Sequence, residues 1–373
     1  MESLKTPAPE CHRIDFDNLE TFRLVTMIKP ADLLEAHSLD LLLVTKPANV
    51  RYLSGFTSPE DGQVVVSAEG MLLLTDSRYT VQAEQESRIP LRIFRQEDKR
   101  MAPADLLKGR VGVEAQHMNL AYLEALKERS AAEYVPTQGL VEKFRQVKSP
   151  DEIEKIRAAA ALADRAWSHV LSYLKPGVCE KDIALELESF MRRQGAEDAA
   201  FEIIVASGER GAMPHGVASS KKLARGELVT LDFGALVEGY HSDMTRTVAL
   251  GKTSKKLKQL YHAVLEAQEE TLAQVGPGKS GKELDAVARG VLQEKGYGEY
   301  FVHSLGHGVG LAVHEGPSLS ALSEDVLALG NVVTVEPGAY VKGLGGVRIE
   351  DLVLVTESGQ EVLSKSSKSW LEL

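Results

Sequence analysis

Short aliphatic runs alternate with charged stretches of helical character between residues 38 and 145. The aliphatic runs lie at 40–44, 63–66, 71–74, 91–94 and 111–113, accompanied by charged stretches at 77–86 and 119–129. This alternation is typical of a sheet with helices packed on it. We therefore predict an α/β domain over residues 1–145. Residues 1–22 show no clear period and are expected to form a loose extension.

A long amphipathic helix is predicted to begin just after residue 149. Ser149 suits the N-cap, Pro150 the first helical position, and Glu152 can complete a capping box. Apolar residues then recur at steps of three and four along one helix face, at Ile153, Ile156, Ala160, Ala163, Trp167 and Val170. This helix opens a second predicted domain, residues 149–373.

The second domain contains an internal repeat. Each copy has a Pro-Gly pair, a following lysine and a glycine suited to end a helix, at Pro176, Gly177, Lys181 and Gly195 and at Pro277, Gly278, Lys282 and Gly296. The stretches VTLDFGA at 229–235 and VTVEPGA at 333–339 recur at nearly the same interval. The repeat predicts two half-domains of helix, helix and hairpin, related by a pseudo-twofold axis, and an α+β fold class.

Composition and charge narrow the class of protein. A chain of 373 residues is longer than one core usually supports, which agrees with two domains. The net charge of −11 disfavours nucleic acid and anionic membranes as partners. Cys11 and Cys179 are too few for a disulfide framework, which suits a cytoplasmic location. The first thirty residues contain charged side chains and no uninterrupted apolar stretch, so no secretory signal is expected. No run of 18 apolar residues occurs, so no membrane-spanning helix is expected either.

Both repeated stretches keep an acid, and each acid has a partner across a predicted turn. Asp232 and Asp243 are equidistant from a turn centred between Val237 and Glu238, so we expect them to face each other. Glu336 and Glu350 flank a second turn, centred on Gly343. Directly opposed carboxylates destabilise a sheet unless a cation lies between them.

Convergence of the two hairpins would place four carboxylates at one centre, which two divalent cations would neutralise. His307, between Gly306 and Gly308, offers an imidazole to the same centre, and His303 and His314 lie in the same segment. An imidazole among carboxylates favours manganese, cobalt, iron or zinc over magnesium or calcium. The sequence thus predicts a dinuclear metal site.

The motifs around these residues resemble those of the pita-bread dinuclear metallopeptidases. The resemblance rests, in order, on MPHG, LDFGA, YHSDMTRT, HSLGHGVG, VEPGAY and GVRIED. Residues 51–56 and 76–79 are similar to the creatinase-type N-terminal domain. Together they point to Xaa-Pro dipeptidases (prolidases) and Xaa-Pro aminopeptidases, and imply a creatinase-type α/β domain followed by a pita-bread catalytic domain.

The resemblance also implies roles for single residues. The implied metal ligands are Asp232, Asp243, His307, Glu336 and Glu350, with Asp243 and Glu350 bridging the two ions. Glu336 would also accept a proton from the attacking water, and His314 would steady the oxyanion or the substrate. The substrate wall would include His215, His303 and, by position, Tyr340. Independently, Arg348 lies two residues before Glu350, on the same strand face, where it can orient carboxylates or pair with Asp232 or Glu350.

Several alternatives remain open at this stage. A methionine aminopeptidase would lack the N-terminal domain, and creatinase or a non-catalytic binding module would lack the metal ligands. A dipeptidase is favoured over an aminopeptidase, and a basic residue meeting the substrate carboxylate would support it; His37, Lys46 and Arg51 are candidates. The expected substrates are proline-containing dipeptides or short peptides. The resemblance further implies a homodimer and two metal ions per subunit, with manganese preferred over cobalt or zinc.

Overall fold

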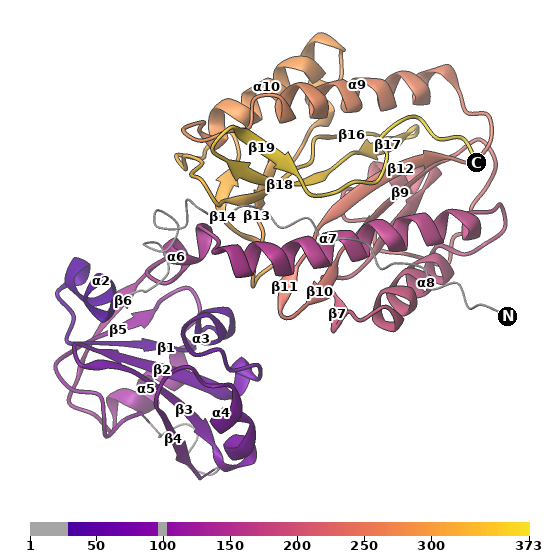
Figure 1. The fold of residues 1–373 in the computed structure, drawn as a ribbon. Coiled ribbons are helices and arrows are strands. Elements are labelled where there is room, and N and C mark those ends of the chain that lie inside the picture. Colours follow the sequence, from indigo (N-terminus) through magenta and orange to yellow (C-terminus); the bar gives the residue numbers. More distant parts are fainter. Residues whose placement is uncertain (1–28, 96–102) are drawn as a thin grey trace, which may run out of the picture.

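The computed structural model describes residues 29–95 and 103–373 (Figure 1). The predicted loose extension over residues 1–22 and Cys11 lie outside the described residues. Within the described residues, no helix is long and apolar enough to cross a membrane.

The N-terminal part of the chain folds as a six-stranded mixed sheet with the order β4-β3-β2-β1-β5-β6. Its strands are β1 Leu41–Val44, β2 Gly62–Ser67, β3 Gly70–Asp76, β4 Leu91–Phe94, β5 Arg110–Glu114 and β6 Glu133–Thr137. The helices are α2 Pro30–Leu34, α3 Pro47–Ser54, α4 Thr80–Glu86 and α5 Leu120–Lys127. The five predicted strands are all present, and the α/β prediction is confirmed; β6 was not predicted.

Both faces of this sheet are buried. Along β1, Leu42 and Val44 pack into one apolar cluster with Phe56, whereas Leu43 packs into a second cluster with Val111. Alternate side chains of a strand point to opposite faces, so β1 contributes to a core on each side. The sheet is therefore the centre of a layered α/β unit, seen at one end of the molecule (Figure 1).

A short helix, α6 Glu142–Gln146, leads from this unit into the 21-residue helix α7 Pro150–Val170. The predicted start of α7 is confirmed: Ser149 is the N-cap, Pro150 follows, and Glu152 completes the capping box. The predicted apolar stripe of α7 is buried along its whole length. The helix thus anchors the second part of the chain against its sheets.

The second part has two halves of similar make-up, as the repeat predicted. After α7, the first half contains α8 Glu180–Arg193 and the sheet β12-β9-β8, formed by Met244–Ala249, Leu228–Phe233 and Ile204–Ser207. A smaller sheet β11-β10-β7 is formed by Tyr240–His241, Ala235–Val237 and Asp198–Ala199.

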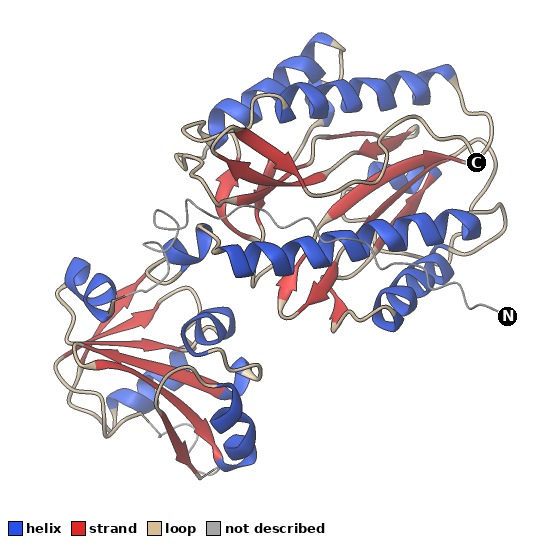
Figure 2. Ribbon diagram, in the orientation of Figure 1, coloured by secondary structure: helices blue, strands red, loops and turns tan. Residues whose placement is uncertain are grey.

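The second half contains α9 Lys255–Leu272, α10 Gly281–Glu294 and the five-stranded sheet β14-β13-β15-β18-β19. These strands are Glu315–Leu319, Gly306–Gly308, Val332–Val335, Asp351–Thr356 and Gly359–Val362. A two-stranded sheet pairs β16 Gly338–Val341 with β17 Gly345–Arg348. Figure 2 shows the larger sheets of both halves lying between α7 on one side and the helix pair α9 and α10 on the other, whereas the small sheet β11-β10-β7 lies beyond α7.

The repeat also fixes where two helices end. Helix α8 is followed by Gly195 with φ of +105°, and α10 by Gly296 with φ of +80°. A side chain with a Cβ is disfavoured in this left-handed region, so glycine is the favoured residue just past a helix end. Both predicted helix ends are confirmed.

The predicted pairing of the first hairpin was wrong, whereas that of the second is confirmed. In the first, Asp232 pairs with Thr245 and Val237 with Tyr240, so the turn is Glu238-Gly239 and Asp232 does not face Asp243 directly. Both turn residues have positive φ, at +48° and +80°, as a two-residue type I′ turn requires. In the second hairpin the turn is centred on Gly343, as predicted, because Val341 pairs with Gly345.

Candidate metal centre and active site

The ends of strands from both halves bring the five predicted ligands to one place. Asp232 lies in β9, Asp243 just before β12, His307 in β13, Glu336 just after β15 and Glu350 just before β18. Ligand atoms of Asp243, His307 and Glu350 lie within 4.8 Å of one another. Glu336 joins this group through its contact with His307, and the charge of Asp232 acts on both Asp243 and Glu350.

His307 is the link between the two halves of the cluster. Its Nε2 lies 3.3 Å from Glu336 Oε1 and 3.7 Å from Asp243 Oδ2. Its backbone passes close to a neighbouring strand, because a Cβ placed at Gly306 would lie 2.2 Å from the carbonyl oxygen of Thr334. The glycine beside His307 therefore lets strand β13 bring the imidazole against the carboxylates.

Burial and like charge act together on the acids. Burial, followed by the charges of Glu350 and Asp232, raises the pKa of Asp243 well above its ordinary value. Burial, followed by the charges of Glu336 and Asp232, does the same to the pKa of Glu350. Burial also raises the pKa of Asp232. The protein alone thus disfavours three negative charges that it nevertheless places together.

Glu336 behaves differently from the other acids. Burial raises its pKa, but the hydrogen bond and charge of His307 outweigh burial and leave the pKa of Glu336 below its ordinary value. The pKa of His307 is in turn raised: burial lowers it, and the hydrogen bond and charge of Glu336 outweigh that effect. Glu336 is therefore the acid of this cluster that stays ionised most readily.

The donor set fits divalent metal ions. Asp232 Oδ1 and Glu350 Oε1 are buried and have no hydrogen-bond partner among the described residues. Unpaired buried carboxylate oxygens are costly, and a cation that neutralises them removes that cost. Carboxylate oxygens with one imidazole suit manganese, iron, cobalt or zinc better than magnesium or calcium.

Two threonine hydroxyls orient the carboxylates and were not predicted. Thr245 Oγ1 donates to Glu350 Oε2 at 2.6 Å, and Thr334 Oγ1 donates to Glu336 Oε1 at 3.0 Å. Each threonine lies in a strand, two residues along the chain from a predicted ligand at the end of that strand, Thr245 from Asp243 and Thr334 from Glu336. The period of two in a strand, which puts such residues on one face, was the signal that could have identified them.

Arg348 is fully enclosed by the site, and its predicted pairing with Asp232 is confirmed. Its guanidinium donates to Asp232 Oδ2, to Thr245 Oγ1 at 3.0 Å and to Tyr340 Oη at 2.8 Å. It also donates to the carbonyl oxygen of Pro214 at 3.1 Å. One side chain thereby joins an acid, a hydroxyl, a phenol and the loop that carries His215.

The three other predicted imidazoles surround this group. His303 Nε2 lies 2.9 Å from Tyr340 Oη, and the ring of His314 lies 4.3 Å from that of His307. His215 follows Pro214, which Arg348 contacts. His215 and His314 are exposed, whereas Asp232, Asp243 and Glu350 are buried. The exposed imidazoles thus lie between the cluster and solvent.

The three basic residues suggested for carboxylate recognition lie in the N-terminal unit. Lys46 Nζ pairs with Glu142 at 2.9 Å, and Arg51 lies 4.0 Å from Glu197. His37 is exposed in the short 3-10 helix Glu35–His37. Lys46 and Arg51 therefore already have acidic neighbours within this chain.

Comparison with known proteins gives two family matches. A model of metallopeptidase family M24 matches residues 154–357, and a model of the creatinase/prolidase N-terminal domain matches residues 29–147. The chain is 39% identical over 352 residues to the Xaa-Pro dipeptidase of Pyrococcus furiosus, covering 94% of this chain and 99% of that relative.

Solved structures agree with these matches. The Xaa-Pro dipeptidase from Bacillus anthracis shares 44% identity and a TM-score of 0.89, covering 92% of this chain and 99% of that one. The X-Pro aminopeptidase from Thermotoga maritima shares 39% identity and a TM-score of 0.83, covering 91% and 99%. The predicted resemblance and the predicted α+β fold, a creatinase-type domain followed by a pita-bread domain, are confirmed.

Proposed function

The chain belongs to metallopeptidase family M24, and from that premise we propose that it is a Xaa-Pro dipeptidase. Such an enzyme hydrolyses the imido bond of dipeptides with proline in second position. The observation that carries the proposal is the buried cluster of acids around His307, in a chain that matches Xaa-Pro dipeptidases over nearly their whole length.

We assign the metal ligands to Asp232, Asp243, His307, Glu336 and Glu350, and expect two divalent ions per subunit, with manganese preferred and cobalt or zinc as alternatives. When bound, such ions supply a nucleophile at neutral pH and polarise the scissile carbonyl. The cluster fits this role because Asp232, Asp243 and Glu350 are buried together and two of their oxygens have no partner among the described residues.

The chain's own groups then orient the substrate and move the proton. Glu336, which is ionised beside His307, accepts the proton of the attacking water. Arg348 fixes Asp232 and Tyr340 through hydrogen bonds. His314 steadies the developing oxyanion, and His215 and His303 form part of the substrate wall together with Tyr340. The imido bond to proline has no N–H, and attack at its carbonyl needs none.

A second function, Xaa-Pro aminopeptidase activity on longer peptides, is favoured by one comparison. The Thermotoga maritima X-Pro aminopeptidase matches this chain at the same 39% identity as the Pyrococcus furiosus dipeptidase. The two activities differ in how far the substrate extends beyond proline, and the ligand cluster serves either one.

A single assay separates these functions. Metal-depleted protein, reloaded with manganese, is tested on a Xaa-Pro dipeptide and on a tripeptide with proline second. Cleavage of the dipeptide alone is the expected result. Preference for the tripeptide would replace the dipeptidase with the aminopeptidase. Absence of metal-dependent cleavage of both would overturn the catalytic proposal in favour of a binding role.

We also propose the bounds of the two domains, the oligomeric state of the protein and its location in the cell. We propose domains at 1–145 and 149–373, supported by family matches over 29–147 and 154–357. We further propose a cytoplasmic homodimer in which residues 1–145 form the dimer contact. Light scattering of the metal-loaded protein is expected to give the mass of two chains, and the mass of one chain would contradict it.

A further inference from the structure

A buried cluster of one acid and two cations lies next to His314 in the chain. The side chain of the next residue, Glu315, is 6% exposed and accepts hydrogen bonds from Arg145 and, at 2.9 Å, from Lys148. The side chains of these two cations are 2% and 1% exposed. One carboxylate thus meets two cations out of contact with bulk water.

Glu315 also contacts the backbone of the loop that carries His314. Its Oε2 accepts a hydrogen bond from the amide of Ala312 at 3.3 Å. Gly310 lies against the same carboxylate, because a Cβ placed there would be 2.5 Å from Glu315 Oε1. The carbonyl of Gly310 in turn accepts hydrogen bonds from the amide and Nδ1 of His241, each at 3.0 Å. The backbone on the N-terminal side of His314 is therefore held by its neighbour in sequence.

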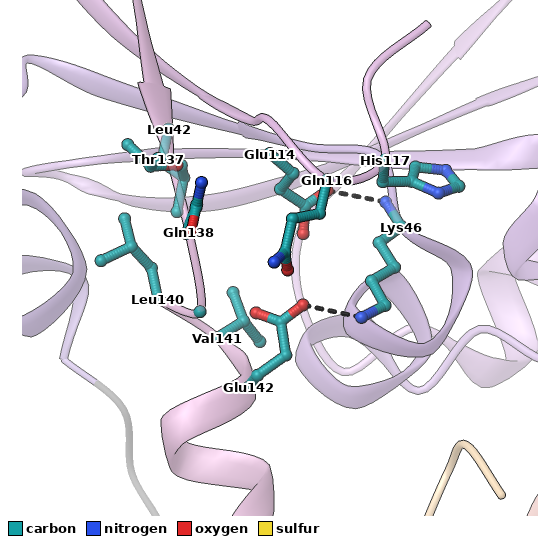
Figure 3. A pocket seen from close by; sticks show the side chains of 11 residues that line it. Leu42, Lys46, Glu114, Gln116, His117, Thr137, Gln138, Leu140, Val141 and Glu142 are labelled. Atoms are coloured by element: carbon teal, nitrogen blue, oxygen red, sulfur yellow. Dashed lines mark hydrogen bonds and ion pairs between the residues drawn. The ribbon is translucent and has the colours of Figure 1, made fainter. Parts of the chain in front are cut away.

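The other end of the ion cluster belongs to the junction between the two domains. Arg145 lies in α6 and donates to Asn49 Oδ1 at 2.7 Å. Asn49 is fully buried in α3, and its Nδ2 donates to Glu114 Oε1 at 2.6 Å and to Glu142 Oε1 at 3.0 Å. Figure 3 shows Glu114 and Glu142 facing the same pocket as Lys46. A continuous chain of hydrogen bonds thus runs from the N-terminal sheet to the residue beside His314.

Stability alone does not account for this arrangement. Burying ion pairs costs desolvation, and apolar residues of similar volume often serve equally well or better in such places. A buried carboxylate with three donors has a fixed position, because the donors hold it from several directions at once. The position that it sets here is that of the His314 backbone.

We propose that Glu315 is a positioning residue, through which the domain junction holds the His314 imidazole in place beside His307. This inference rests on the proposed function only for the catalytic role of His314. It assigns a purpose to Arg145 and Lys148, which lie between the two domains and contact neither the proposed ligands nor His314 among the interactions described.

The first test is the kinetics of Glu315→Gln in metal-loaded protein. A misplaced catalytic group is expected to lower kcat on the order of tenfold to a hundredfold, with a smaller change in KM. Glu361→Gln is the control, because Glu361 likewise pairs with an arginine, Arg157, through two hydrogen bonds, but joins β19 to α7. The control is expected to keep wild-type kcat.

A double-mutant cycle then distinguishes positioning from general damage. If Glu315 acts through His314, Glu315→Gln has little further effect on kcat in a His314→Ala background. If the two losses multiply, Glu315 acts independently of His314 and the inference is overturned. Should Glu315→Gln not fold, Arg145→Lys takes its place in the cycle, because lysine cannot span both Asn49 and Glu315.

The last readout does not depend on activity. The rate at which diethyl pyrocarbonate modifies His314 is followed by mass spectrometry in the metal-loaded wild type, Glu315→Gln and Glu361→Gln, with exposed His215 as the internal reference. A changed rate at His314 in Glu315→Gln alone is expected, and an unchanged rate overturns the inference. If the wild type cleaves no Xaa-Pro peptide, the proposed function fails, while this rate still decides the positioning role.

Discussion

Arg348 shows how much of the site depends on the shape of one side chain. Its planar guanidinium reaches Asp232, Thr245 and Tyr340 from a single position. Lysine carries the same charge but lacks the rigid fork of donors. Arg348→Lys is therefore expected to fold and to lose on the order of a hundredfold in kcat. Steady-state kinetics with circular dichroism as the folding check tests this, and near-wild-type kcat would contradict it.

Asp243 allows a prediction about the sign of its contribution to stability. Because burial and neighbouring acids raise its pKa, its charge destabilises the metal-free protein at neutral pH. Asp243→Asn should therefore stabilise the metal-free protein. The same change should abolish most of the stabilisation that saturating manganese gives the wild type, which is about 2.7 kcal/mol at a hundredfold excess over Kd.

Denaturant unfolding with and without manganese measures both effects of Asp243→Asn. A variant that is less stable than wild type without metal, yet still gains stability from metal, would show that Asp243 is neither a repelled charge nor a ligand.

At the scale of elements, two helices hold the segments that carry His215 and His303. In α8, buried Glu180 accepts hydrogen bonds from the amides and hydroxyls of Ser207 and Ser219 and pairs with Arg210. In α10, Asp285 accepts from Arg289, which donates to the carbonyl of His303 at 2.6 Å. The two halves of the repeat thus fix their loops in similar ways.

Glu180→Gln is expected to destabilise the protein by about 3 kcal/mol, because it leaves the guanidinium of Arg210 without its buried counter-charge. Glu188→Gln on the same helix is the control: its pair with Arg192 is 41% and 44% exposed, so the loss should stay below about 1 kcal/mol. Urea unfolding of both variants measures the difference, and equal losses would contradict the role given to Glu180.

Elements were predictable where the local signal was strong. The cap at Ser149 and the glycines at 195 and 296 have local physical causes, and these were read correctly. Strand β6 was missed because Pro136 interrupts its pattern, which an edge strand tolerates. The first hairpin was misplaced by assuming symmetry about its two acids, although Gly239 marked the second position of a type I′ turn.

At the scale of the whole molecule, the cluster of acids around His307 could be predicted, but the contacts that reach it from the domain junction could not. The repeat and the motifs in the sequence predicted that five residues from both halves meet at one centre. The contact of Arg145 with Glu315 joins residues far apart in the chain, and no periodicity links them. Such contacts depend on how two folded domains meet, so sequence patterns within either domain carry no trace of them.

The ion cluster at that junction predicts how the stability of the protein changes with pH. Burial raises the pKa of Glu315, but the charges of Lys148 and Arg145 outweigh burial and lower it below the ordinary value of 4.5. A carboxyl with a lowered pKa contributes stability that is present above the unfolded pKa and is lost as pH falls through the folded one. The difference in unfolding free energy between wild type and Glu315→Gln should therefore be largest at neutral pH and shrink below about pH 4.5.

Urea unfolding in chelator across this pH range measures the difference without interference from metal release. Glu361→Gln again serves as the control, because its pairing with Arg157 also lowers the pKa of Glu361 but leaves both side chains about a third exposed, so its difference should be smaller throughout. A difference that stays constant from neutral to acid pH would mean that the charge of Glu315 contributes nothing to holding the two domains together, and that only its shape matters at the junction.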